Sequence, residues 1–435
     1  MIGCILFPAE FKLFPNCKTW CVAMNLLSIF AGSGGATYGF SNIFSPILAV
    51  EERLPEARTL VLNIPLELRT CFGFVHAEKN KAYQCDVRQI SFKQLAGDVD
   101  VLLATPPSSD FSIAMAGRRK GIAGRKGSLL LEVPRVAKEA QPSMVVLEEV
   151  EGLLSTNKGR DWLFFVQEMR SVGYHLAFRR ILNYAGFGVP QNKRRLVAVF
   201  TKQQSQISNL DIPYDRLLLR CPMTPLEVFE GLPIDHLQNQ YADFLDQWKS
   251  EVQSLEQPFA SLIQRELSKL SGDIIEDYIR LNSACSRKVI DVAFDRHKEV
   301  LKELGYFGKR VWKGKEVPSC LKPTIERMKR IPPGKGIEVL KGTKYWKKTN
   351  VSLAYRRIHP IVPSYTLPAN AGGGTYGYHY LPSRCALTNE ERKRLQTFPD
   401  DYVFLGSGIE KRRQITDSMP PLAAKRISEA IVGFI

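Results

Sequence analysis

The sequence predicts an α/β fold with a doubly wound, mostly parallel sheet. Between residues 25 and 200, short apolar runs of strand length alternate with helical segments, the pattern of a sheet built from βαβ units. The first strand, residues 25–30, leads into a glycine-rich turn and then a helix start at residues 36–40. This order favours a nucleotide-like ligand, because it brings backbone amides close to the bound group.

Length and charge limit the classes of protein to consider. The chain has 435 residues, enough for two domains, and a net charge of +16. Such a charge indicates a polyanionic partner, with nucleic acid as the first candidate and an anionic membrane surface as the second. The sequence has no apolar run of about 18 residues, so it predicts no membrane-spanning helix. The nine cysteines are scattered without zinc-site spacing, so we expect no metal and a reducing, cytoplasmic environment.

Two acidic side chains follow predicted strands near the glycine turn. The second strand, residues 47–50, ends at Glu51, where a carboxylate can accept both hydroxyls of a ribose. Asp86 lies near another strand end, in a position to accept from an adenine amino group. For each residue, the alternative is a solvated loop charge.

A stiff loop follows the apolar run at residues 98–103. Its sequence is Ala-Thr-Pro-Pro-Ser-Ser-Asp-Phe-Ser, residues 104–112. Pro106 and Pro107 cannot donate to a sheet ladder, so the strand must end there. Open α/β sheets bind ligands at the carboxyl ends of their strands, where this loop begins. An isolated Pro-Pro pair also suits a surface connector.

The remaining segments divide the chain further. A strand at 144–147 precedes Glu148 and Glu149, and helices are expected at 129–140 and 162–172, with a final helix at 421–431. The basic, glycine-rich loop 117–127 suits a phosphate backbone, or is simply a solvated face. From about residue 202 the alternation stops, and the region to 350 is helical and loop-like.

Together these motifs resemble the DNA (cytosine-5)-methyltransferase family. Phe30-Ala31-Gly32-Ser33-Gly34-Gly35 looks like its S-adenosylmethionine loop, and the Pro-Pro stretch with Asp110-Phe111-Ser112 looks like its catalytic loop. Glu148-Glu149-Val150 stands where the family has Glu-Asn-Val, and residues 191–195 resemble its Gln-x-Arg-x-Arg element. Residues 395–402 and 414–421 resemble the two closing motifs.

The resemblance implies a set of functional residues. The catalytic residues it implies are Pro107, Ser108, Glu148, Glu149 and Arg195. The S-adenosylmethionine-binding residues it implies are Phe30, Ala31, Gly32, Ser33, Gly34, Gly35, Glu51 for the ribose, Asp86 for the adenine, Pro106 and Ser418.

The resemblance also implies a domain plan and partners. After an N-terminal appendage at 1–23, the catalytic domain takes residues 24–201, a smaller DNA target-recognition domain with its connecting segment takes 202–384, and residues 385–435 return to the catalytic domain. The implied partner is duplex DNA, whose target base the family flips into the catalytic pocket. A monomer on DNA, within a restriction-modification system, is expected.

The catalytic loop departs from the family where the chemistry requires a thiolate. In the family a Cys attacks carbon 6 of cytosine, which makes carbon 5 nucleophilic, while a glutamate hydrogen-bonds ring nitrogen 3. The Cys position here is Ser108, whose hydroxyl ionises negligibly at neutral pH. Other departures are Ala104-Thr105 for Gly-Gly, Ser109 for Gln, Glu149 for Asn, Lys193 for the first Arg, and residues 416–419 in the last motif.

Three hypotheses therefore stay open. In the first, the chain methylates carbon 5 of cytosine, either poorly or with Ser108 as a substitute nucleophile. Alternatively it methylates an exocyclic amine, N4 of cytosine or N6 of adenine, which needs acceptors such as Glu148 and Glu149 but no covalent nucleophile. In the third, it is a catalytically inactive DNA-binding relative that retains the cofactor and the fold.

Overall fold

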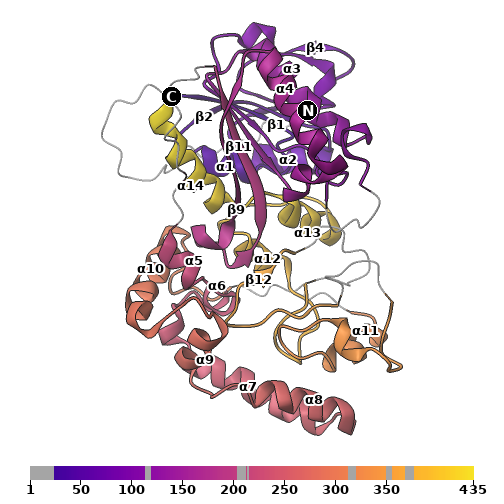
Figure 1. Ribbon diagram of the computed structural model, residues 1–435, viewed down its shortest axis with the longest axis vertical. Coiled ribbons are helices and arrows are strands. Elements are labelled where there is room, and N and C mark those ends of the chain that lie inside the picture. The colour runs from indigo at the N-terminus through magenta and orange to yellow at the C-terminus, as the bar shows by residue number, and fades with distance from the viewer. Residues whose placement is uncertain are drawn as a thin grey trace, which may run out of the picture.

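A single eight-stranded sheet organises the N-terminal half of the chain (Figure 1). The computed structural model describes residues 24–112, 119–202, 212, 215–311, 320–348, 355–367 and 377–435, so the expected appendage at 1–23 lies outside it. The strand order is β3-β5-β2-β1-β7-β8-β11-β9. Their bounds are β1 Asn25–Ile29, β2 Ser45–Glu51, β3 Glu67–Thr70, β5 Lys81–Gln84, β7 Val101–Ala104, β8 Met144–Glu149, β9 His175–Asn183 and β11 Arg194–Thr201.

The pairing directions confirm the predicted fold class. The strands from β3 to β8 pair in parallel, whereas β11 runs antiparallel to both β8 and β9. The central strands are almost wholly buried because helices cover both faces, and their sequences are correspondingly rich in Val, Leu and Ile. The mostly parallel, doubly wound sheet expected from the alternation of strands and helices is present.

Helices from both ends of the chain cover the sheet. One face is covered by α3 (Glu132–Ala140) and α4 (Arg160–Ser171), which pack on alternate residues such as Leu102 and Leu147. The other face is covered by α1 (Gly35–Phe40) and α14 (Pro421–Ile431), which pack on Leu103 and Val146. The expected final helix at 421–431 therefore lies on the first helix of the chain, as Figure 1 shows.

The middle of the chain forms a second, largely helical lobe below the sheet (Figure 1). The core of this lobe contains Trp248, Tyr278 and Phe244, all of them completely buried. Its helices are α5 Arg216–Arg220, α6 Pro225–Glu230, α7 Gln238–Gln253, α8 Gln257–Leu267, α9 Ile274–Leu281, α10 Ile290–Glu303 and α11 Lys322–Lys329. Two helices of the closing segment, α12 (Asn389–Leu395) and α13 (Gly408–Asp417), lie where the lobes meet.

In the described residues, two short strand pairs form separate from the main sheet. The pair β10 (Gln191–Asn192) and β12 (Ser364–Tyr365) links the element before β11 to the closing part of the chain. The pair β4 (Val75–His76) and β6 (Ile90–Ser91) lies beyond the edge of the main sheet. Within the described ranges, no helix is long and apolar enough to span a bilayer.

The cysteines correct one prediction. In the described residues, disulfides join Cys71 to Cys85, Cys221 to Cys285 and Cys320 to Cys385. The expectation of a reduced chain is therefore wrong for these six. Two of the bridges close loops of 64 and 65 residues, so no short spacing in the sequence could reveal them.

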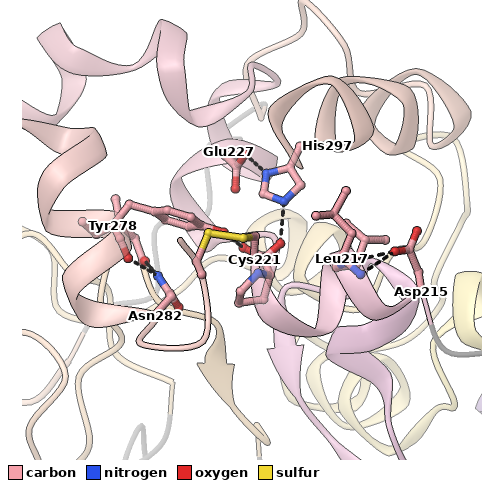
Figure 2. Close-up of a disulfide and its surroundings, with 11 residues drawn as sticks. Asp215, Leu217, Cys221, Glu227, Tyr278, Asn282 and His297 are labelled. Carbon is pink, nitrogen blue, oxygen red and sulfur yellow. Dashed lines mark hydrogen bonds and ion pairs between the residues drawn. A yellow bond between two sulfur atoms is a disulfide. The ribbon is translucent and has the colours of Figure 1, made fainter. Parts of the chain in front are cut away.

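One of these bridges lies inside a buried polar network (Figure 2). The Cys221 carbonyl is 2.8 Å from Nε2 of His297, and Nδ1 of the same ring is 2.7 Å from Glu227 Oε1. His297 and Glu227 are fully buried. Burial lowers the pKa of His297, but the Glu227 carboxylate and the Cys221 carbonyl outweigh it, so the pKa is raised. The bridge ties the end of α5 to the segment after α9, and the His297–Glu227 pair joins α10 to α6.

Candidate active site

The predicted site residues gather at one edge of the sheet. β1, β2, β5, β7 and β8 are parallel, so their carboxyl ends meet at the same edge. The segments that leave this edge are the glycine turn after β1, Glu51, Asp86, the Pro-Pro loop after β7, and Glu148 with Glu149 at the end of β8. The sequence predicted each as the residue following a strand, and the topology brings them together.

The glycine turn has the backbone geometry that its sequence requires. Gly32 has φ +57° and Gly34 φ +92°, left-handed values that are strained for other residues. A Cβ added to Gly34 would lie 2.8 Å from the Tyr402 hydroxyl, whereas one added to Gly32 would meet nothing within 4 Å. The turn is therefore packed on one side and open at Gly32, which suits a ligand lying over the backbone.

Glu51 faces this turn. Its Oε2 accepts from the Gly32 amide at 2.9 Å, and its Oε1 accepts from the Arg53 amide at 2.9 Å. Burial is the main cause that raises the pKa of Glu51 to about 7, and the two amides oppose it. This position, at the end of the second strand and beside the glycine turn, is the one for which the sequence predicts a ribose acceptor.

Asp86 is engaged by a neighbour. It caps a short 3-10 turn by accepting from the Arg88 amide at 3.0 Å, and Arg88 Nε also donates to it at 2.9 Å. The Arg88 hydrogen bonds hold the pKa of Asp86 below its usual range. The carboxylate stays ionised and about one-fifth exposed, so it can still accept a further hydrogen bond.

The Pro-Pro loop is anchored at both ends. Thr105 Oγ1 donates to the Phe30 carbonyl at 2.9 Å, which ties the loop to the glycine turn. Asp110 Oδ2 accepts from the amides of Lys126 and Gly127 at 3.0 and 2.8 Å, which ties it to the described part of the basic loop. Residues 117 and 118 of that loop lie outside the described ranges. Ser108, between these anchors, is half-buried.

Glu148 is held by two side chains. Arg195 Nε lies 3.2 Å from Glu148 Oε1, and the Tyr184 hydroxyl donates to the same oxygen at 3.1 Å. The Glu148 and Arg195 side chains are 12% and 18% exposed, so the pair is largely shielded but open on one side. Both contacts leave Oε2 of Glu148 available to a ligand.

Glu149 points away from Glu148, as alternation along a strand requires. It is 1% exposed, its Oε2 accepts from the Val150 amide, and no described residue hydrogen-bonds its Oε1. Burial raises the pKa of Glu149 well above its ordinary value, which favours the protonated form. Glu149 is therefore far less accessible to a ligand than Glu148.

The closing segment completes the cofactor edge. Ser418 Oγ lies 2.9 Å from Ser33 Oγ in the glycine turn, and the Tyr402 hydroxyl donates to the Ser33 carbonyl. A Cβ on Gly35 would lie 2.6 Å from the Met419 carbonyl, so this contact requires glycine. No cluster of three metal-ligating side chains occurs in the part of the chain that the structure describes.

An open α/β sheet with a glycine turn, a ribose-type acid and a carboxylate beside a Pro-Pro loop defines a nucleotide-cofactor enzyme of the methyltransferase class. The family model "C-5 cytosine-specific DNA methylase" matches residues 24–433, so the chain belongs to that family. Its members take the methyl group from S-adenosylmethionine, and the open Gly32 turn with Glu51 fits that cofactor.

Individual relatives agree with this assignment. The DNA (cytosine-5-)-methyltransferase M.ApeKI of Aeropyrum pernix is 36% identical, over 93% of this chain and 97% of its own. The type II methyltransferase M.BbvI of Brevibacillus brevis is 29% identical, over 80% of this chain and 74% of its own. The Entamoeba histolytica methyltransferase EhMeth shares the fold at a TM-score of 0.53 and 9% identity, over 94% of this chain and 98% of its own.

Sequence reasoning did not find every residue of the site. Tyr184, which contacts Glu148, comes from a turn after β9 that carries no motif. Tyr402 lies within a closing motif, but nothing in that motif predicted its contact with Ser33. The roles predicted for the catalytic and cofactor-binding residues all stay predictions, as do the domain bounds.

Proposed function

We propose that the chain transfers a methyl group to carbon 5 of a cytosine flipped out of duplex DNA, with Ser108 in the position of the nucleophile. The observation that carries this proposal is that Arg195 and Tyr184 both contact the same carboxyl oxygen of Glu148, Oε1. This arrangement leaves one carboxyl oxygen free to carry a proton, which it can donate to ring nitrogen 3 of the base. Register also supports it: Ala104 pairs with Leu147, so the Pro-Pro loop and Glu148 leave neighbouring strands side by side.

Each group has a separate task in the proposed reaction. Bound S-adenosylmethionine supplies an electrophilic methyl group. Ser108 Oγ would add to carbon 6 while its hydroxyl proton passes to solvent, which gives carbon 5 the electron density to take the methyl. Solvent would then take the carbon 5 proton as the bond between Oγ and carbon 6 breaks and releases the serine. Glu148 would donate a proton from its free oxygen to ring nitrogen 3, where negative charge develops.

The weak step is activation of Ser108. Among the described residues, none accepts a hydrogen bond from its hydroxyl, so none of these residues is placed as its general base. A serine without a base reacts far more slowly than a thiolate. We therefore expect slow turnover, and the same observation favours the second candidate function, a DNA-binding relative that binds the cofactor but transfers no methyl.

The helical lobe is proposed to recognise the DNA. Its stretch 341–348 places four exposed lysines around Tyr345 and Trp346, which suits phosphate contact and base stacking. One chain carries the cofactor lobe and this lobe, which supports a monomer acting on duplex DNA. We also infer a cytoplasmic, DNA-associated location.

The test is to identify the product. The protein is incubated with S-adenosylmethionine labelled in the methyl group and with unmethylated genomic DNA, and the digested nucleosides are separated and weighed. Label in 5-methylcytosine is the expected result. Label in N4-methylcytosine or N6-methyladenine would contradict the proposal in favour of the exocyclic-amine alternative. No label despite DNA binding would support the inactive relative.

A further inference from the structure

Lys193 is a buried lysine for which the proposed reaction has no use. It lies between β10 and β11, two residues before Arg195, and is 1% exposed. The ammonium group donates to the Ser418 carbonyl at 2.7 Å, the Thr416 carbonyl at 3.2 Å and Gln396 Oε1 at 3.3 Å. Its three protons are thus matched by three acceptors, all from the closing segment.

These acceptors belong to the wall of the cofactor edge. Ser418, whose carbonyl Lys193 binds, directs its own hydroxyl to Ser33 in the glycine turn at 2.9 Å. Gln396 Nε2 also donates to the Thr416 carbonyl at 3.2 Å. Lys193 therefore fixes the end of α13. Through Ser418, this end contacts the glycine turn over which the cofactor is proposed to lie.

We propose that Lys193 is a positioning residue for S-adenosylmethionine: it holds the 416–418 turn against Ser33, so that the segment carrying Arg195 also shapes the cofactor loop. Arg195, two residues further along the chain in β11, contacts Glu148 in the proposed base pocket. One short segment thereby supports both halves of the active site, through two side chains that touch different partners.

The electrostatics agree with a role that depends on hydrogen bonding. Burial is the main cause that lowers the pKa of Lys193 to about 7, and Arg195 adds to the effect while Glu148 and Asp417 oppose it. Burying a lysine costs free energy, and hydrogen bonds from all of its donors offset that cost. An apolar side chain of similar length would remove the donor from all three acceptors, of which the Thr416 carbonyl alone would keep the hydrogen bond from Gln396 Nε2 that is described above.

The experiment separates a cofactor effect from a general loss of structure. S-adenosylmethionine binding is measured by calorimetry without DNA, and binding to a mixed-sequence duplex is measured without cofactor. We expect K193M to weaken cofactor binding about tenfold and to leave duplex binding within about twofold. K193R, with the residue of the family motif, retains donors and should restore most of the cofactor affinity.

Two results would overturn the proposal. One is cofactor affinity in K193M equal to that of the unmodified chain. The other is an equal loss of cofactor and duplex binding together with a lower melting temperature, since that is what a purely structural role predicts. If K193M does not fold, K193Q, which keeps one donor, is held to the same criteria, with a smaller expected loss of cofactor affinity.

Discussion

Arg195 and Glu148 form an ion pair of 3.2 Å at the end of two antiparallel strands, β11 and β8. The pair is shielded on most sides, and Tyr184 shares the same carboxyl oxygen. Because two donors take Oε1, the orientation of the carboxyl is fixed before any base arrives. Such preorganisation is what makes a charged group effective in catalysis.

Glu148→Gln should abolish most methyl transfer while leaving the fold intact. The amide has the same shape but cannot carry the proton or the charge, and we expect turnover to fall by roughly 10²- to 10⁴-fold. Duplex and cofactor binding should change little. The matched control is Glu151→Gln, which removes a carboxylate that pairs with Arg194 in a more exposed position. Equal losses in both variants would remove Glu148 from its proposed role.

Cofactor binding should depend on pH through Glu51. Its pKa is raised to about 7, so as the pH falls below 7 the neutral form predominates, and one of the two oxygens proposed to accept the ribose hydroxyls becomes a donor. Affinity should therefore rise with pH and level off above 7, with binding roughly tenfold weaker at pH 6 than at pH 8.

Glu51→Gln should bind the cofactor more weakly and without this pH dependence. Glu52→Gln, which alters the exposed neighbouring acid, should keep the slope of the unmodified chain. Calorimetric titration at several pH values decides the matter. An unchanged slope in Glu51→Gln would assign the dependence to another group.

The Cys221–Cys285 bridge should stabilise the helical lobe. It closes a loop of 64 residues, for which the chain-entropy model gives roughly 4 kcal/mol. The double variant Cys221→Ser, Cys285→Ser should lower the free energy of unfolding in urea by up to that amount. Peptide mapping without reductant should recover the linked peptides from the unmodified chain. Equal unfolding midpoints without reductant would show that the bridge does not contribute.

Most of the fold was predictable because it rests on local patterns. The buried strands β1, β2, β7 and β8 are continuous apolar runs, and α14 has the predicted bounds. The strand β9 was missed because it lies at the sheet edge, where Arg179 and Arg180 are exposed and interrupt the apolar run. The helix expected at 129–140 begins at Glu132, after a 3-10 turn.

The candidate site, like the fold, has one part that local sequence patterns predict and another that they do not. Glu51 and Glu148 follow strands, so their meeting at one edge follows from a parallel sheet. Contacts that join segments hundreds of residues apart, such as Lys193 with Ser418 and Tyr402 with Ser33, depend on packing that no periodicity encodes. The disulfides belong to this second group.

The central claim is that Ser108 stands in the place of the nucleophile. Its most direct test compares Ser108→Cys with the unmodified chain for methyl transfer to carbon 5 of cytosine at saturating cofactor and DNA. A thiol with a pKa near 8.5 supplies far more nucleophilic anion than a serine hydroxyl, so turnover should rise by about 100-fold or more, which corresponds to roughly 2.7 kcal/mol of barrier. No gain, with cofactor and duplex binding intact, would contradict the account.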